Sequence, residues 1–195
     1  MNENEQSIVR YRLDPDRSQF TVQAFAMGLL AGFGHNPTIG IRGFTGEAQF
    51  VPGTFASASL RLAIETRSLT VLDEIEAKDR EEIERKMLND VLEASFYSEI
   101  SFQSTNITVN RIDDRQYKVR IIGDLNLHGV TRHGLSIMSQ ITLDGDELRA
   151  HGDFTLRQTD YKIKRVSVAA GALKLKDELK FSFDIMGYRI DADVI

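Results

Sequence analysis

The sequence contains no cysteine and no tryptophan, and only three prolines interrupt its 195 residues. Without cysteine, the chain can have no disulfide framework, no thiolate metal site and no cysteine nucleophile. No apolar run approaches the roughly 20 residues that a membrane-spanning helix needs. The net charge of −5 argues against a nucleic-acid-binding surface. A hydrophobic content of 42% nevertheless suffices for one domain with a sizeable core.

The first residues, Met1 to Ser7, are polar and have neither a basic start nor an apolar segment. They therefore do not resemble a secretory signal, and we expect a cytoplasmic protein, or a periplasmic one if a signal has been removed. Residues 1–10 are expected to form a disordered polar tail. Residues 11–195 are expected to form a single β-barrel domain with one inserted helix.

Apolar and polar residues alternate with a period of two in several segments. The even positions are mostly apolar in 56–66, the odd positions are apolar in 117–127, and the alternation returns in 179–186. This period indicates β-strands with one dry face and one wet face. Within 38–51 the apolar parity changes around Gly43, which predicts a bulge or a sharp bend.

Residues 73–93 do not show this strand pattern. They are rich in charged residues and place Ile83, Met87 and Val91 at helical spacing. This pattern predicts an amphipathic helix whose apolar stripe covers one end of a barrel. About eight strands in hairpin order surround the helix in the sequence. The predicted fold class is therefore all-β with one inserted helix: an eight-stranded antiparallel up-and-down barrel, lipocalin-like, of a size that can hold one small ligand.

Several motifs, in order, resemble the YceI family. They include Tyr11–Ser18, Gly34–Pro37 and, most closely, Gly123–Arg132 with its His-Gly-Val-Thr-Arg ending. The resemblance extends from about Tyr11 to about Ile185. It implies a lipocalin-like barrel that binds a long amphiphile in its interior, such as a polyisoprenoid, a polyprenyl phosphate, a quinone or a fatty acid. It also implies a homodimer, with no enzymatic activity and no cofactor.

Two features depart from the pattern of this family. Tyr161 and Lys162 stand where the family usually has phenylalanine and glycine, and the acidic helix is longer. Both departures concern the identity of the ligand rather than the fold.

If a lipid tail occupies the barrel, the inward-facing apolar residues form its tunnel. Periodicity alone favours the alternative that these side chains simply fill the barrel, whereas the resemblance favours a tunnel. The candidate tunnel residues are Phe20, Val22, Phe44, Phe50, Leu60, Leu62, Phe102, Leu125, Leu127, Phe154, Phe181 and Phe183.

A polar head group would need hydrogen-bond donors at the mouth of the barrel. Arginine suits a phosphate because its planar fork donates two hydrogen bonds. The ordinary alternatives are that His128 fixes a turn and that Arg157 forms an ion pair with Asp160. The candidate head-group residues are His35, Asn36, His128, Arg132 and Arg157.

The four histidines raise the question of a metal or catalytic centre. His128 and His133 flank a predicted turn, and His151 falls on the outward face of its strand. No HExxH or GxSxG motif is present. We therefore expect no metal, no cofactor and no enzymatic activity. The competing hypothesis is a stress-related structural or interaction protein whose barrel is filled by side chains and holds no ligand.

Overall fold

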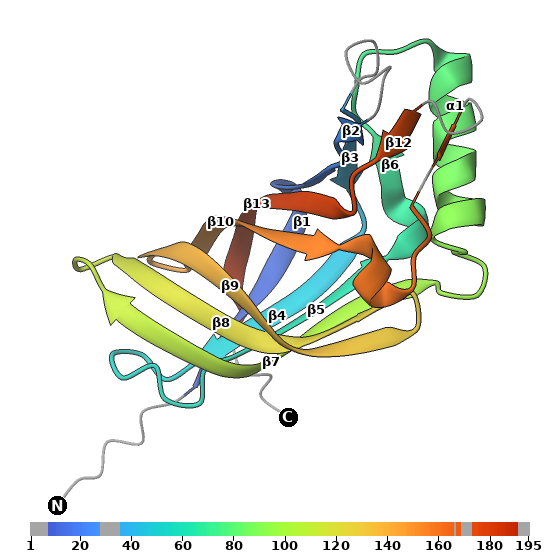
Figure 1. The fold of residues 1–195 in the computed structure, drawn as a ribbon. Coiled ribbons are helices and arrows are strands. Elements are labelled where there is room, and N and C mark those ends of the chain that lie inside the picture. Colours follow the sequence, from blue (N-terminus) through green and yellow to red (C-terminus); the bar gives the residue numbers. More distant parts are fainter. Residues whose placement is uncertain (1–7, 28–35, 166, 169–172, 191–195) are drawn as a thin grey trace, which may run out of the picture.

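The computed structural model describes residues 8–27, 36–165, 167–168 and 173–190, and in these ranges eight antiparallel strands close into a barrel. Each strand pairs with the next along the chain, and the last pairs with the first (Figure 1). The fold class predicted from the sequence is confirmed. The strands are β1 (Val9–Gln23), β4 (Phe44–Phe50), β5 (Ser59–Glu65), β7 (Glu99–Arg111), β8 (Gln116–Leu127), β9 (Val130–Asp144), β10 (Glu147–Arg157) and β13 (Glu178–Ile190).

The first barrel strand begins earlier than the sequence indicated. Residues 1–7 of the expected tail lie outside the described residues, but Val9 and Arg10 already belong to β1. Val9 is buried and packs against Tyr11, Phe50 and Leu148. The apolar side chain of Val9 therefore extends the alternation of β1 into the segment that we expected to be disordered.

The change of parity around Gly43 marks a break between two strands. Residues 38–51, where the sequence predicts a bulge or a sharp bend, form β3 (Thr38–Ile41) and β4. β3 pairs with the end of β1 and with β6 (Leu69–Val71), whereas β4 pairs with the start of β1 and with β5. A Cβ atom at Gly43 would lie 2.8 Å from the Cβ atom of Ser68, so the bend has no room for a side chain.

The inserted helix is shorter than predicted and lies at one end of the barrel (Figure 1). It consists of α1 (Ala77–Lys86) and a π-helical turn, η2 (Met87–Val91), within the predicted range of 73–93. Its start is delayed because the Asp73 carboxylate accepts a hydrogen bond from the Thr38 amide at 2.9 Å. Farther along, Glu84 accepts one from the Val71 amide at 2.8 Å, which joins α1 to β6.

Short elements complete the end of the barrel that carries α1, which we call the helix end. Two of them are 3-10 turns, η1 (Thr66–Ser68) and η3 (Gln158–Tyr161). The others are β2 (Ala26–Met27), β11 (Ser167–Val168) and β12 (Leu173–Leu175), which form a second small sheet. No helix of the described ranges has the length and apolar character to cross a membrane.

Candidate functional site

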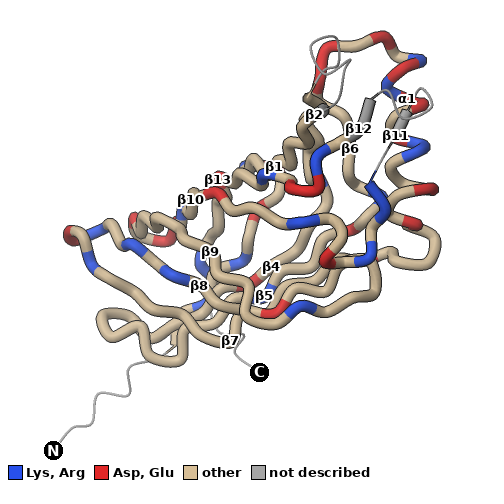
Figure 2. Tube along the Cα trace, viewed as in Figure 1, with Lys and Arg blue, Asp and Glu red and all other residues tan. Residues whose placement is uncertain are grey.

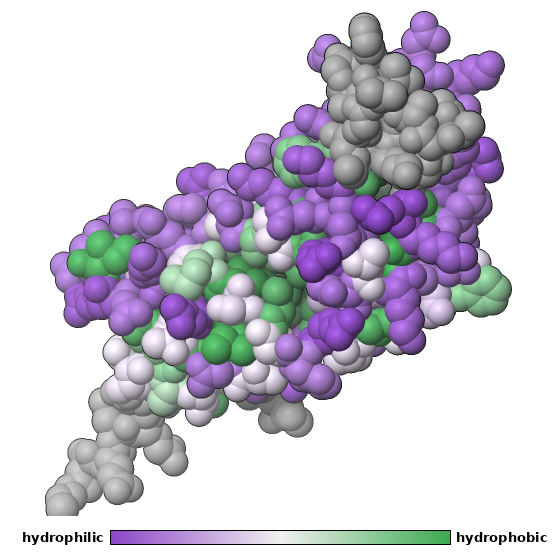
Figure 3. Space-filling view, viewed as in Figure 1, coloured by the Kyte–Doolittle hydropathy of each residue, from purple (hydrophilic) through white to green (hydrophobic). Residues whose placement is uncertain are grey.

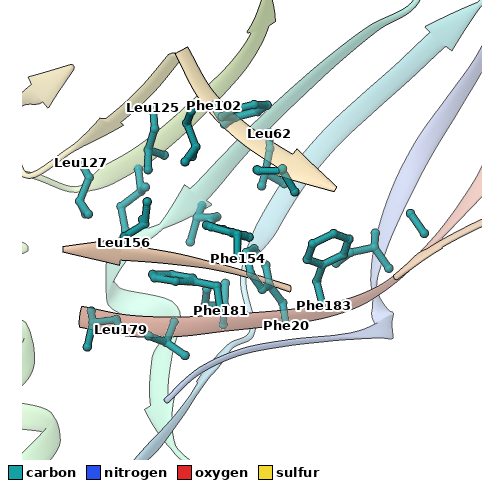
Figure 4. Close-up of a pocket in the computed structure, with 18 of the residues that line it drawn as sticks. Phe20, Leu62, Phe102, Leu125, Leu127, Phe154, Leu156, Leu179, Phe181 and Phe183 are labelled. Atoms are coloured by element: carbon teal, nitrogen blue, oxygen red, sulfur yellow. The ribbon is translucent and has the colours of Figure 1, made fainter. Parts of the chain in front are cut away.

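The barrel encloses a cavity of about 620 Å³, within the range of small-molecule sites. Inward-facing side chains of all eight barrel strands line it. The inserted helical segment contributes both apolar and charged residues: Asp79, Glu82, Ile83, Lys86, Met87, Val91 and Leu92. Figure 4 shows leucine and phenylalanine side chains from several strands pointing into a common space. The cavity is therefore the inner face of the alternating pattern, left partly empty by the side chains that form it.

Two buried polar side chains in the wall, Ser139 and Gln158, bond to the protein itself. The buried Ser139 hydroxyl donates a hydrogen bond to the His151 carbonyl at 3.1 Å, and the buried Gln158 amide donates one to the Lys176 carbonyl at 2.9 Å. These bonds occupy the Ser139 hydroxyl proton and one N–H of Gln158. Most of the other residues that line the barrel interior are apolar.

Phenylalanines cover one side of the cavity. Phe154 stacks on Phe181 with ring centroids 4.9 Å apart, and Phe20 meets Phe181 and Phe183 edge to face. Rings packed against one another in this way keep their positions beside empty space. The aromatic side therefore forms a firm wall for an apolar ligand.

Eleven of the twelve predicted tunnel residues line the cavity, and Phe44 is the exception. Phe44 is buried behind Phe20, with ring centroids 6.3 Å apart, immediately after the bend at Gly43. Contact of the other residues with a ligand stays a prediction. The residues that line the cavity are Phe20, Val22, Phe50, Leu60, Leu62, Phe102, Leu125, Leu127, Phe154, Phe181 and Phe183.

Further cavity residues were missing from the predicted set. Leu135, Ile137 and Ile141 of β9 follow the same alternation as the predicted residues, so their parity could have assigned them. Phe55 could not have been found in this way, because it lies in the loop between β4 and β5 with φ of 56°.

A chain of aromatic rings closes the barrel end opposite α1, which we call the far end. Tyr11 stacks on Phe50 at 5.7 Å, Phe50 contacts Phe55 at 5.1 Å, and Phe55 meets Tyr117 edge to face at 4.8 Å. Burial is the main cause of the raised pKa of the Tyr11 phenol. Phe50, Phe55 and Tyr117 of this chain of rings border the cavity at the far end, together with Leu143 and Leu148.

The wall of the barrel has a slot between β9 and β10. Their pairing stops at Met138 and Asp153, although β9 begins at Val130 and β10 continues to Arg157. In this slot β9 stays paired with β8, and β10 with β13. Figure 3 shows hydrophobic residues in a hollow at the place where Figure 1 shows these two strands apart. The apolar side chains that line both the slot and the cavity are Leu135, Ile137, Phe154 and Leu156.

A family model described as a YceI-like domain matches residues 11–186. The chain belongs to the YceI family. No match was found among curated protein sequences.

Solved structures of low sequence identity share the fold. BcnA of Burkholderia cenocepacia has a TM-score of 0.67 at 14% identity, over 89% of this chain and 98% of that chain. A polyisoprenoid binding domain from Saccharophagus degradans, described as implicated in plant cell wall breakdown, has a TM-score of 0.66 at 13% identity, over 92% and 98%. The Campylobacter jejuni YCEI protein has a TM-score of 0.56 at 15% identity, over 81% and 87%.

The YceI-like motif Gly123–Arg132 forms the end of β8 and the turn into β9. His128 in this turn has φ of 53°, and its ring contacts Tyr97 with centroids 4.3 Å apart. Its Nε2 atom lies 2.8 Å from the Glu93 carboxylate, and its Nδ1 atom 3.3 Å from the Tyr161 carbonyl. His128 therefore joins the turn to the segment just after η2 and to η3, and it does not line the cavity.

The two predicted arginines also lie around η3 in this YceI-family chain. Arg132 donates from Nε to the Asp160 carbonyl at 2.7 Å. Arg157 pairs with Asp177 at 3.1 Å, so the expected ion pair with Asp160 is wrong. The reason is that Asp177 also accepts the Thr159 amide, which fixes its carboxylate beside Arg157. Neither arginine lines the cavity.

The two remaining head-group candidates belong to the segment before β3. His35 lies outside the described residues, whereas Asn36 is exposed and precedes Pro37, which lines the cavity. Charged residues of both signs surround this end of the barrel in Figure 2. Among the described residues no group of three or more His, Asp or Glu side chains is placed to hold a metal ion.

Proposed function

We propose that this YceI-family chain is a non-enzymatic binding or carrier protein for a long amphiphilic lipid. The observation that carries the proposal is the apolar cavity of about 620 Å³ inside the barrel. Membership of the family and the fold shared with a polyisoprenoid binding domain support the same class of ligand. The ligand would be a polyisoprenoid, a polyprenyl phosphate, a quinone or a fatty acid.

The energetics of such a site depend on the tail. Each buried methylene contributes roughly 0.8 kcal/mol, so a tail of about a dozen carbons gives roughly 10 kcal/mol of favourable transfer. Association costs about 4–15 kcal/mol, part of which is saved when the cavity is already formed. At the low end of that cost, roughly 6 kcal/mol of favourable free energy remains from the tail alone.

The head group would lie near the helix end, where the candidate donors are found. Arg132 is the best suited of them, because it is exposed and uses only its Nε atom in the described structure. Its terminal nitrogens are then left to donate to a phosphate or carboxylate. Asn36 and His35 would contribute from the segment before β3. His128 and Arg157 would support the head group indirectly through η3.

Mass spectrometry of lipids extracted from gently purified protein tests the proposal. We expect about one amphiphile per chain, and displacement of a bound fluorescent fatty-acid probe by that amphiphile. Recovery of no stoichiometric lipid, together with no probe binding, would contradict the proposal. That outcome would favour the structural or interaction protein with an unoccupied barrel.

Two further properties stay predictions. The resemblance to the family implies a homodimer, which sedimentation of the purified protein tests. The cytoplasmic or periplasmic location is tested by fractionation of cells that produce the protein from its natural gene.

A further inference from the structure

We propose that the lipid enters and leaves the barrel sideways, through the slot between β9 and β10. The tail would pass between Leu135 and Ile137 on one strand and Phe154 and Leu156 on the other. This inference rests on the proposed function, since it concerns the route to the same cavity. It is carried by three observations: aromatic rings lie across the far end, the pairing of β9 with β10 stops beside the cavity, and the edges of the slot are apolar.

The far end offers no passage, because four aromatic rings lie across it. The contacts among Tyr11, Phe50, Phe55 and Tyr117 place neighbouring ring centroids between 4.8 and 5.7 Å apart. Rings at these distances are in contact and leave no channel between them. Passage there would require the loop that carries Phe55 to leave the barrel.

The apolar stripe of the inserted helix covers part of the helix end, where the cavity also reaches the exposed residues Asp79 and Glu82. Met87, Leu88 and Leu92 pack on the cluster that contains Ile39, Leu69 and Val71. The hydrogen bond from the Val71 amide to Glu84 fixes the helix to β6 at the same place. Passage at this end would expose the stripe to water, at a cost of roughly 25 cal/mol per Å² of apolar area.

A bulge in β9 accounts for the slot. The register between β8 and β9 shifts by one residue at His133 and Gly134, and Gly134 has φ of 76°. The Asp124 carboxylate on β8 holds the bulge, since it pairs with His133 at 2.9 Å and accepts the Gly134 amide at 3.4 Å. A bulge of this kind bends its strand and re-aims the following residues. β9 is thereby turned away from β10.

The slot has a fixed contact at each of its two limits. At one limit is the last residue pair between β9 and β10, Met138 and Asp153. At the other limit is η3, which Arg132 and His128 hold to the start of β9 through the carbonyls of Asp160 and Tyr161. The opening is thus framed by hydrogen bonds, and each strand beside it keeps its partner on the outer side. The strands can separate slightly there without breaking the rest of the barrel.

The chemistry of the slot suits an amphiphile. Its edges are the apolar side chains of two strands, and Arg132 lies where the slot meets η3. A tail passing inward would keep apolar contact throughout, while an anionic head group stayed beside the guanidinium in water. The ligand class is therefore an amphiphile with one long tail and an anionic head.

Closing the slot with a covalent link tests the route, and the absence of native cysteine makes the experiment clean. Continuing the register beyond Met138 and Asp153 puts Ser136 opposite Thr155, and both are exposed. The variant is Ser136→Cys/Thr155→Cys, linked by a disulfide or, where that does not form, by a short bismaleimide. The matched control is Gln140→Cys/His151→Cys, which links the same strands where they are already paired.

The readout is the rate of uptake and release of cis-parinaric acid, a fluorescent fatty acid, by delipidated protein. We expect the link at 136/155 to slow uptake about tenfold or more, and to trap probe loaded beforehand. Reduction of the disulfide should restore the rates, and the control link should leave them unchanged. A bulky maleimide on Thr155→Cys should also slow uptake, and the same label on His151→Cys should not.

The outcomes separate this inference from the proposed function. If linked and unlinked proteins bind the probe at equal rates, the slot is not the route and the helix end takes its place. If the unlinked protein binds neither the probe nor any extracted lipid, the proposed function itself is wrong.

Discussion

Lys162 adopts a backbone conformation that a side chain disfavours. It follows η3 with φ of 58°, in the left-handed region, where a Cβ atom costs roughly 1–2 kcal/mol. The YceI pattern has glycine at this position. Since glycine adds some chain entropy to the unfolded state, we expect Lys162→Gly to raise the free energy of unfolding by up to about 1 kcal/mol. Urea unfolding measures the change.

Lys164 provides the control for this variant. It is exposed, close in sequence to Lys162, and its φ is not positive. Lys164→Gly should therefore have no strain to relieve and should be neutral or slightly destabilising. A Lys162→Gly chain less stable than the unaltered one would contradict the argument.

Substitutions at Phe44 and Phe183 distinguish the effect of core packing on stability from the effect of cavity contact on ligand affinity. Phe44 is 4% exposed and lies behind Phe20, whereas Phe183 borders the cavity. Phe44→Ala should lower the free energy of unfolding by roughly 3–5 kcal/mol, and Phe183→Ala by less, because part of its surface already faces empty space. Phe183→Ala should change the affinity for cis-parinaric acid more than Phe44→Ala does. Denaturant titration and probe titration of both variants check this, and the reverse order would contradict it.

At the scale of elements, η3 depends on one carboxylate. Asp177 accepts the Thr159 hydroxyl at 2.6 Å, the Thr159 amide at 2.9 Å and Arg157 Nε at 3.1 Å. These bonds, the hydroxyl bond first, lower the pKa of Asp177. A lowered pKa in the folded state means that the carboxylate stabilises the fold above its unfolded pKa of about 3.9, and that this is lost as pH falls through the folded value.

We therefore expect Asp177→Asn to be less stable than the unaltered chain at pH 7, with a difference that vanishes in strong acid. Chemical unfolding across a pH series measures the difference. Hydrogen exchange of the amides in 158–161 should accelerate in this variant. Asp184→Asn, which removes a carboxylate bonded to Arg149 away from η3, should leave that exchange unchanged. Equal acceleration in both variants would show that Asp177 does not act through η3.

The elements also show where sequence reasoning succeeds and where it stops. The break at Gly43 was predictable, because a change of parity must be absorbed by a bend. The start of the helix was not, since Asp73 bonds to the Thr38 amide, a partner 35 residues away in the chain. β5 begins at Ser59 rather than Ala56, because positive φ values at Phe55 and Ser57 turn the loop back over the barrel.

At the scale of the whole molecule, the alternation predicted the wall of the cavity but not its openings. Ile137 and Phe154 fit the alternation of apolar and polar residues in β9 and β10. These two strands are nevertheless not paired with each other at these residues. We attribute the separation to the bulge at Gly134 and to the packing of η3, which involve residues of β8 and of the segment after β10. Local periodicity carries no signal for such contacts. The volume left empty in the barrel likewise depends on how all the inward side chains pack together.

If the proposed lipid binds, the aromatic rings at the far end would select ligands by chain length. With the head group near Arg132, we expect a tail to extend only as far as Phe55. In a series of saturated fatty acids, affinity should rise roughly fourfold per methylene and then level off at one chain length.

Phe55→Ala should move this plateau to longer chains, as measured by displacement of cis-parinaric acid. Phe96→Ala, which removes a phenylalanine that is 81% exposed, should leave the plateau in place. Affinity that climbs without limit, or a plateau unmoved in Phe55→Ala, would contradict the argument. A single loop residue would then decide which members of a lipid series the protein carries.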